Sequence, residues 1–329
     1  MSRFDYILDK VSKAPVSKEP FRHIYIPNLF SAEDFSEITN SPEVGIPPAS
    51  SDEDLFSKLY ASGYRIIEFP GCITDQGAYT AWHQTKGLSS EKVHTACEGF
   101  GMTLRLIAPK SDVLDELNRF LTGEEFNSVL ADRCGVKLSD CSIDGGIQKY
   151  LDGYEISPHP DVRAKAGTFM VNINPHNGAE SLNHHTHYMR FVEERKYVRD
   201  FWERAGFADR CWVPWAWCET AKTQPENNSM VLFSPSNDTL HAVKAEYDHL
   251  RGQRTQLYGN LWYKNKPKMV QVEWEELAKG DLDAIKPPRA TIKDVARAVL
   301  PSSVRDALSS VAGSGRNKPN ADSFHSRKY

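Results

Sequence analysis

Two short motifs in the second half of this 329-residue chain carry side chains that could bind a metal ion. His159 and Asp161 are two residues apart, and on an extended segment residues i and i+2 point to the same face. The imidazole and the carboxylate therefore lie side by side. His241 stands 80 residues after Asp161, between a polar turn and the apolar residues Ala242 and Val243. Two imidazoles and one carboxylate on the same side of a metal leave its remaining positions open for reactants.

An arginine soon after His241 adds a group that could bind an acid. Arg251 and Arg254 follow His241 by 10 and 13 residues, and a hairpin between antiparallel strands would return either of them to the metal. A guanidinium is always charged and holds a carboxylate with two parallel hydrogen bonds, so it suits the distal carboxylate of a 2-oxo diacid. Gln148 and Tyr150 alternate on an expected strand, so they are candidates to face the same cavity and bind the same acid.

The elements that must position these residues are mostly short and β-prone. Turn residues, such as those between Ser234 and Asp238, separate them. Short strands separated by turn residues predict a mainly β fold, a double-stranded β-helix or jelly roll with flanking α-helices. The expected strands are residues 23–26, 147–150, 167–173, 230–233 and 257–263.

Three stretches are expected to be helical. Ser31 opens a capping box, which predicts a helix from the next residue onward. Residues 111–134 carry apolar side chains at helical spacing, and Gly123 breaks the run in two. Residues 187–206 also have apolar residues at helical spacing and are predicted to be helical.

The predicted organisation is one domain followed by a tail. The β core should carry an insertion that covers one mouth of the barrel and ends with Trp212, Trp215 and Trp217, which could stack on a ring-shaped substrate. The predicted domain spans residues 1–286. It consists of helix-rich support at 1–140 and a β core at 141–268, which contains the insertion at 176–225. Short helices and a disordered tail follow over 287–329.

Composition restricts the function classes. The formal net charge is -4 and charged residues make up 26%, so no basic excess indicates a nucleic-acid partner. The sequence contains no run of about 18 apolar residues, so no membrane span is predicted. The N-terminus has no apolar signal core. The six cysteines are scattered without a Cys-x-x-Cys pair, which predicts free thiols in a reducing compartment and hence a cytoplasmic protein.

The stretch 145–263 resembles the catalytic core of the Fe(II)/2-oxoglutarate-dependent oxygenases, in the prolyl 4-hydroxylase-like branch. The His159-Pro160-Asp161 motif, the strand that precedes His241, and the Gly-x-Arg segment that ends at Arg254 carry the resemblance. The segment 176–225 departs from it, because it lacks the Gly-Gly-Glu-Leu type of strand found in many members.

The resemblance implies a site and a reaction. Fe(II) would be held by His159, Asp161 and His241, and 2-oxoglutarate by Arg254. Hydroxylation of an unactivated C–H bond would be coupled to O2 and to the decarboxylation of 2-oxoglutarate to succinate and CO2. Because Asp161 is present, hydroxylation is favoured over halogenation, which needs the carboxylate position vacated. The substrate class stays open: a small metabolite, a sugar-containing compound or a protein side chain.

Other readings of the same residues stay open. The fold could be a cupin-like metal-dependent isomerase or lyase that ignores 2-oxoglutarate, or a non-catalytic jelly-roll module whose tryptophans recognise a glycan. His184, His185 and His187 form a cluster that could bind a second metal or line the substrate pocket. His249 lies in a charged turn and is expected to be solvated.

Overall fold

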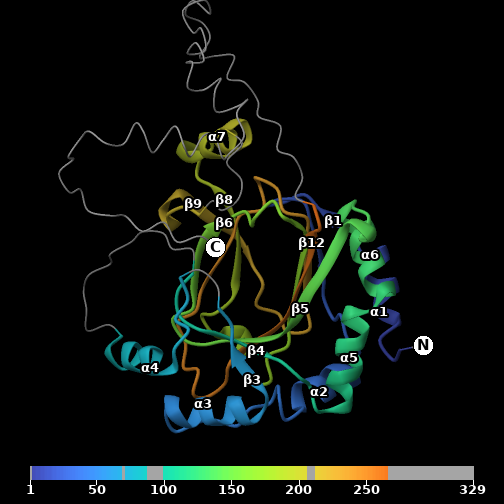
Figure 1. Ribbon diagram of the computed structural model, residues 1–329. Coiled ribbons are helices and arrows are strands. Elements are labelled where there is room, and N and C mark those ends of the chain that lie inside the picture. Colours follow the sequence, from blue (N-terminus) through green and yellow to red (C-terminus); the bar gives the residue numbers. More distant parts are fainter. Residues whose placement is uncertain (1, 69–70, 87–98, 206–211, 266–329) are drawn as a thin grey trace, which may run out of the picture. The chain divides into compact units, whose positions relative to one another are not determined.

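A computed structural model describes the chain except for residues 1, 69–70, 87–98, 206–211 and 266–329 (Figure 1). Twelve strands in the described part form two antiparallel sheets. The large sheet contains, in spatial order, β1 (Val16–Ser17), β2 (His23–Ile26), β10 (Met230–Phe233), β7 (Lys165–Asn172), β12 (Arg254–Tyr263), β5 (Cys141–Tyr150), β4 (Thr103–Leu106) and β3 (Tyr64–Ile66). The small sheet contains β6 (Glu155–His159), β11 (His241–Lys244), β8 (Thr186–Phe191) and β9 (Cys218–Thr223).

The strands β5 to β12 follow the path of a jelly roll. β5, β7, β10 and β12 lie in the large sheet, and β6, β8, β9 and β11 lie in the small one. The chain therefore passes repeatedly from one sheet to the other, and every pairing is antiparallel. This strand order confirms the predicted mainly β fold of the double-stranded β-helix type.

Helices flank the two sheets. Their α-helical bounds are α1 (Tyr6–Lys13), α2 (Ala32–Asn40), α3 (Asp52–Ala61), α4 (Gln76–Thr85), α5 (Asp112–Thr122), α6 (Glu124–Cys134) and α7 (Tyr197–Ala205). Short 3-10 turns occupy η1 (Leu138–Asp140), η2 (Ala179–Ser181), η3 (Glu193–Arg195) and η4 (Trp215–Trp217). The predicted capping box is confirmed, since the Ser31 hydroxyl accepts the Asp34 backbone N–H at 3.0 Å.

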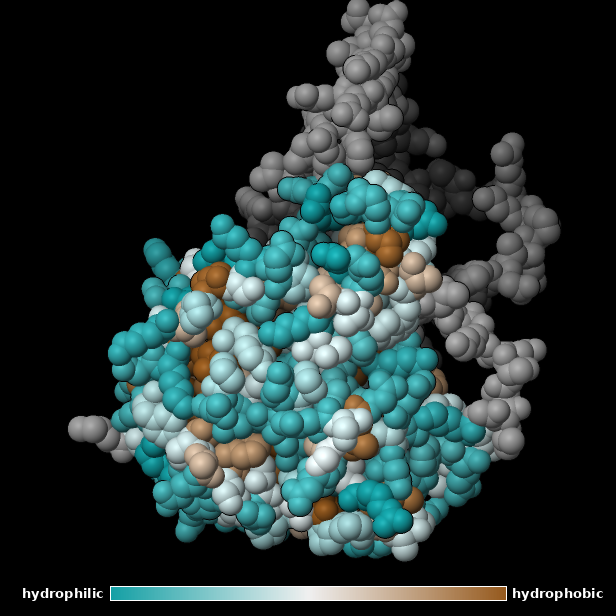
Figure 2. Space-filling view, turned by 180° about the vertical axis from the view of Figure 1, so that it is seen from behind, coloured by the Kyte–Doolittle hydropathy of each residue, from teal (hydrophilic) through white to brown (hydrophobic). Residues whose placement is uncertain are grey.

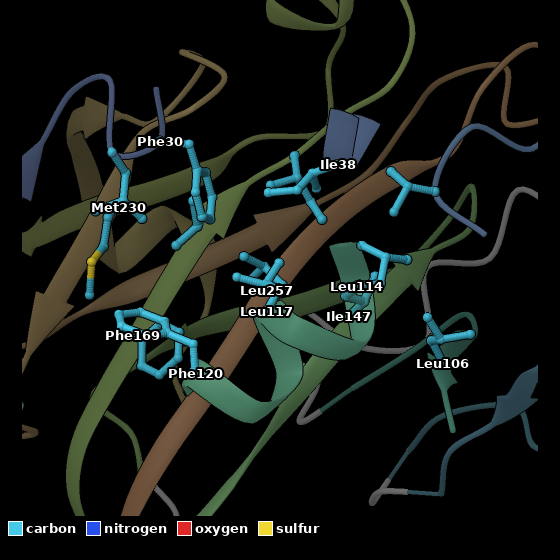
Figure 3. Packing of buried hydrophobic residues seen from close by; sticks show 14 of the residues in the cluster. Phe30, Ile38, Leu106, Leu114, Leu117, Phe120, Ile147, Phe169, Met230 and Leu257 are labelled. Carbon is cyan, nitrogen blue, oxygen red and sulfur yellow. The ribbon is translucent and has the colours of Figure 1, made fainter. Parts of the chain in front are cut away.

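The main hydrophobic core lies between the large sheet and the helices beside it. Figure 3 shows Leu117 and Phe120 of α5 packed over Ile147, Phe169 and Leu257 of the strands. Burying an aliphatic or aromatic side chain of this kind stabilises the fold by roughly 1.5 to 3 kcal/mol relative to leaving it exposed. This layer therefore holds the sheet from its outer side and leaves the inner side free for polar residues.

The alternation along β7 separates the two sides of the large sheet. Phe169 and Val171 join the core under the helices, whereas Thr168, Met170 and Asn172 face the interior of the jelly roll. On the neighbouring strand, a Cβ added at Gly259 would lie 2.2 Å from the Phe169 ring. Glycine is therefore needed there for the two strands to pack.

The prediction of a helix over 187–206 is wrong in its first half. Residues 186–191 form β8, which pairs with β11 on one side and with β9 on the other, and only α7 is helical. Two neighbouring strands satisfy the backbone groups of β8. The segment 176–225 therefore supplies half of the small sheet and is more than an insertion over the barrel mouth.

Other predictions about the periphery have mixed outcomes. The face in Figure 2 is mostly hydrophilic, with small scattered hydrophobic patches. None of the helices in the described ranges has the length and apolar character that crossing a membrane requires. Among the described cysteines, Cys134, Cys141 and Cys218 are free thiols, as predicted. The helices and tail expected over 287–329 lie outside the described residues, and the domain boundaries stay predictions.

A polar cluster, here called the clasp, ties α3 and α4 to two loops of the jelly roll. It consists of Asp52, His83, Asp152 and His249. The two ring nitrogens of His83 lie 2.8 Å from an oxygen of Asp52 and 3.1 Å from an oxygen of Asp152. Ionised carboxylates only accept, so both nitrogens donate and the ring is an imidazolium. Asp152 in particular, together with Asp52, raises the pKa of His83 despite its partial burial.

The expectation that His249 is solvated is wrong, because the side chain is buried. Its Nδ1 accepts the backbone N–H of Asp152 at 2.9 Å, and its Nε2 therefore carries the proton and donates to Asp52 at 2.8 Å. His249, His83 and Asp52 lie close enough to hold a metal ion. However, both nitrogens of His249 are already used within the protein, so the clasp is a structural cluster.

The clasp predicts a pH dependence of stability. The pKa of His83 is raised in the folded state, so its contribution is full below its unfolded pKa of about 6.5 and is lost as pH rises through the folded pKa. The difference in free energy of unfolding between the wild type and His83→Gln should be largest near pH about 5.5 and should shrink toward pH about 9. Urea unfolding measured across this range tests it.

The matched control is His187→Gln. The ring of His187 contacts the Thr220 hydroxyl at 3.0 Å instead of a carboxylate, and burial lowers its pKa. Its loss should give no extra destabilisation at low pH. A difference for His83→Gln that stays constant from pH about 5.5 to about 9 would contradict the charged clasp.

Candidate metal centre

The two histidines predicted as metal ligands stand opposite each other on paired strands of the small sheet. His159 ends β6 and His241 begins β11, and they are direct partners in the register. The Nδ1 of His159 lies 2.9 Å from the carbonyl oxygen of Ser157, and the Nδ1 of His241 lies 2.8 Å from that of Thr239. Because a carbonyl only accepts, each Nδ1 carries the proton and each Nε2 keeps a free lone pair.

Asp161 completes the set of ligand atoms. The Nε2 of His159 lies 3.6 Å from one carboxylate oxygen, and the Nε2 of His241 lies 3.9 Å from the other. The backbone of Asp161 has φ of 68°, a left-handed conformation that costs roughly 1 to 3 kcal/mol for a residue with a side chain. The chain turns back at this residue, so its carboxylate faces both rings.

Electrostatics favour an ionised Asp161 beside the two rings. Burial raises the pKa of Asp161, but the Lys165 ammonium, together with the two histidines, outweighs burial and holds that pKa well below its ordinary value. Burial, with a smaller contribution from His159, lowers the pKa of His241 to about 3. Two imidazoles and a carboxylate, all with ligand atoms within 4.8 Å of one another, fit a divalent metal ion.

Asp161 has two further partners that sequence analysis missed. The ammonium of Lys165 lies 2.8 Å from Oδ1, and the hydroxyl of Thr168 donates to Oδ2 at 3.1 Å. Thr168 lies on the inward face of β7, and Lys165 is the first residue of that strand. The alternation of β7 could have predicted Thr168. The contact of Lys165 depends on the turn at Asp161, which no pattern in the sequence indicates.

A cavity of about 740 Å³ opens beside the metal centre. All six residues predicted for the site line it: His159, Asp161, His241, Arg254, Gln148 and Tyr150. Side chains from both sheets therefore line one cavity large enough for a small molecule.

Arg254 is a buried cation that pairs with no anion among the described residues. It is 2% exposed, its guanidinium lies 4.5 Å from the centroid of the Tyr150 ring, and its Nη2 donates to the Thr186 hydroxyl at 3.0 Å. Its Nη1 has no hydrogen-bond partner among the described residues. Burial lowers the pKa of Arg254, and nearby tyrosines offset part of this effect. A buried charge of this kind is costly without a partner, so the cavity is suited to receive an acid.

The rival arginine lies elsewhere. The side chain of Arg251 is 84% exposed, with Asp248 3.6 Å away, and it does not line the cavity. The connection between β11 and β12 carries Arg251 on its outer side, whereas Arg254 is the first residue of β12.

Gln148 and Tyr150 face the cavity but also bond to each other. The Tyr150 hydroxyl lies 2.6 Å from the amide of Gln148, and the opposite end of that amide reaches Arg105 at 2.8 Å. Arg105 in turn donates to Asp144 at 2.9 Å. This chain of contacts fixes the ring of Tyr150 under Arg254.

The other predicted candidates lie largely outside the centre. His187 contacts Trp215 edge to face, and Trp215 donates to Glu155 at 2.8 Å, so neither lines the cavity. Trp212 does line it, at the side of the small sheet. Within the described residues, the histidines at 184, 185 and 187 do not form a group with the geometry of a metal site.

No family model and no curated protein matches the chain. Solved structures give low similarity. A Pseudomonas putida prolyl-4-hydroxylase is 10% identical, with 80% of this chain and 100% of that chain covered and a TM-score of 0.36. The epimerase SnoN, in complex with Fe3+, alpha ketoglutarate and nogalamycin RO, is 11% identical, with 80% and 87% covered and a TM-score of 0.38.

HygX from Streptomyces hygroscopicus, with nickel, 2-oxoglutarate and hygromycin B bound, is 10% identical, with 84% and 94% covered and a TM-score of 0.34. Because these TM-scores are below 0.5, the fold of this chain rests on its own strand order.

Proposed function

We propose that this protein is an Fe(II)- and 2-oxoglutarate-dependent oxygenase that hydroxylates an unactivated C–H bond of a small molecule. The observation that carries the proposal is the presence, in one cavity, of a His-Asp-His centre with free Nε2 atoms and a buried arginine without an anion. A metal centre alone would suit many reactions. The buried guanidinium of Arg254, which pairs with no anion among the described residues, favours a reaction that also binds an acid.

His159, Asp161 and His241 are the residues that would hold the iron. When bound, Fe(II) supplies O2 activation coupled to the decarboxylation of 2-oxoglutarate. The protein contributes a fixed set of ligands, because the Ser157 and Thr239 carbonyls orient the two rings before any metal arrives.

Arg254 would bind the distal carboxylate of 2-oxoglutarate. Its free Nη1 and the nearby Thr186 hydroxyl offer donors to that carboxylate, and the Tyr150 ring keeps the guanidinium in place. In this buried position the ion pair is little screened by water or salt, so it binds more strongly than the same pair at the surface. A metal-dependent isomerase or lyase of the cupin type has no need of such an acid-binding group, which makes that alternative weaker.

The remaining cavity would hold the substrate and exclude water from the reacting atoms. Its wall is partly apolar, with Ile156, Val162, Met170 and Val243 around the metal centre. The cavity volume of about 740 Å³ suits a small organic molecule better than a folded protein surface. A non-catalytic glycan-binding module would not need the metal ligands.

The first prediction concerns Asp161. Anaerobic addition of Fe(II) and then 2-oxoglutarate to metal-free protein should give a weak visible charge-transfer band that needs both additions. In Asp161→Ala the band should be lost or strongly weakened, because one of three protein ligands is missing. Asp115→Ala is the matched control, since Asp115 is exposed on α5 and pairs with Arg119. Normal iron binding without any band in the wild type would refute the proposed function.

A second prediction separates the two arginines. In nickel-loaded protein, Arg254→Met should weaken 2-oxoglutarate binding by about a hundredfold, or roughly 3 kcal/mol, because a buried carboxylate loses its partner. Arg251→Met should bind 2-oxoglutarate like the wild type, because its side chain is exposed. Isothermal titration calorimetry measures both. The proposal fails if neither variant weakens binding, and its assignment of Arg254 fails if only Arg251→Met does.

A further inference from the structure

Lys165 lines the cavity, and one N–H donor of its ammonium has no acceptor among the described residues. Its Nζ lies 2.8 Å from a carboxylate oxygen of Asp161 and 2.8 Å from the hydroxyl of Tyr258. The rings of Tyr258 and Trp262 both have their centroids 5.5 Å from Nζ. An ammonium has three donors, and the described residues accept two of them. The side chain is 9% exposed, so the third donor faces the cavity instead of bulk water.

The hydroxyl of Tyr258 adds a second donor at the same place. It accepts from Lys165, so its own hydrogen is available to another acceptor, and within the described ranges no residue accepts it. Tyr258 lies on the inward face of β12, four residues after Arg254, and it lines the cavity. An N–H and an O–H therefore stand side by side next to the metal centre.

In the loaded centre Asp161 would be shared between Lys165 and the metal, so the charge of Lys165 would be only partly balanced. Arg105 is paired with Asp144. In the proposed complex Arg254 meets the distal carboxylate of 2-oxoglutarate, and Fe(II) balances Asp161 together with the other carboxylate. Part of the positive charge of Lys165 is then unbalanced, which is costly in a buried position. Glu68, the other acid of the wall, is exposed, so water screens its charge.

We propose that the substrate is a carboxylic acid, whose carboxylate is bound by Lys165 and Tyr258 beside the metal centre. The inference rests on the proposed function and adds the substrate class to it. The rings of Tyr258 and Trp262 flank the ammonium and give an apolar surface to the part of the substrate next to its carboxylate. The oxidised carbon is then close to the acid group.

The test compares three ligands of one shape. Nickel- and 2-oxoglutarate-loaded wild-type protein is titrated with 3-phenylpropionate, its neutral amide 3-phenylpropionamide, and the cation 3-phenylpropylammonium. Ligand-observed NMR gives the dissociation constants. The carboxylate should bind about tenfold or more tightly than the amide, since a hydrogen bond to a charged partner is worth more than one to a neutral partner. The ammonium should bind weakest, because it repels Lys165.

Variants assign the effect to the two donors. Lys165→Met should weaken 3-phenylpropionate binding by about tenfold or more, and Tyr258→Phe, which keeps the ring, by about threefold. In each variant the loss of 2-oxoglutarate binding should be smaller than the loss of 3-phenylpropionate binding, because 2-oxoglutarate also has Arg254 and the metal as partners. Lys222→Met is the matched control, since Lys222 lies over the Tyr25 ring and does not line the cavity.

Two results would overturn the inference. One is equal binding of the carboxylate and the amide to the wild type. The other is a loss of 2-oxoglutarate binding in Lys165→Met as large as the loss of 3-phenylpropionate binding, which would assign Lys165 to the cofactor. Failure of the proposed function is separate, because it appears as a missing charge-transfer band with Fe(II) and 2-oxoglutarate.

Discussion

The antiparallel pairing of β6 with β11 is the constraint on which the candidate metal centre depends. It sets His159 directly opposite His241, with ring centroids 4.3 Å apart. Each ring donates its Nδ1–H to the carbonyl two residues earlier on its own segment, so the backbone that forms the pair also sets the tautomer. Asp161 then needs only one left-handed residue to turn its carboxylate toward both rings. The geometry of the ligands follows from hydrogen bonds of the fold, before any metal is bound.

The large sheet divides its residues between two different environments. The outer faces of β5, β7 and β12 place Ile147, Phe169 and Leu257 under the helices (Figure 3). Their inner faces carry polar and charged side chains. Burying the cations Lys165 and Arg254 on the inner face opposes folding unless they find partners. The apolar layer on the outer face offsets this cost. The fold can therefore keep Lys165 and Arg254 buried in the cavity wall.

The helix-rich half of the chain also acts on the site. The clasp fixes the connection between β11 and β12, because His249 bonds to Asp52 and the side chain of Gln253 donates to the His249 carbonyl at 2.7 Å. The next residue is Arg254, whose backbone N–H donates to the hydroxyl of Tyr247. Residues from α3 and α4 thus help to decide where the guanidinium enters the cavity. A mutation in these helices can therefore change the position of Arg254 through the β11–β12 connection.

The sequence by itself determined the jelly-roll class, the strands at 23–26 and 230–233, and the grouping of His159, Asp161 and His241, because these follow from local spacing and turn chemistry. It favoured Arg254 but kept Arg251 as a rival, since both fit one hairpin, and it assigned β8 to a helix because its apolar spacing fits both periods. Only the tertiary structure decided between the two arginines, by burying Arg254. It also decided between helix and strand for β8, by pairing that segment on both sides. Lys165, Tyr258 and the clasp lie beyond local patterns, since each depends on contacts between residues far apart in the chain.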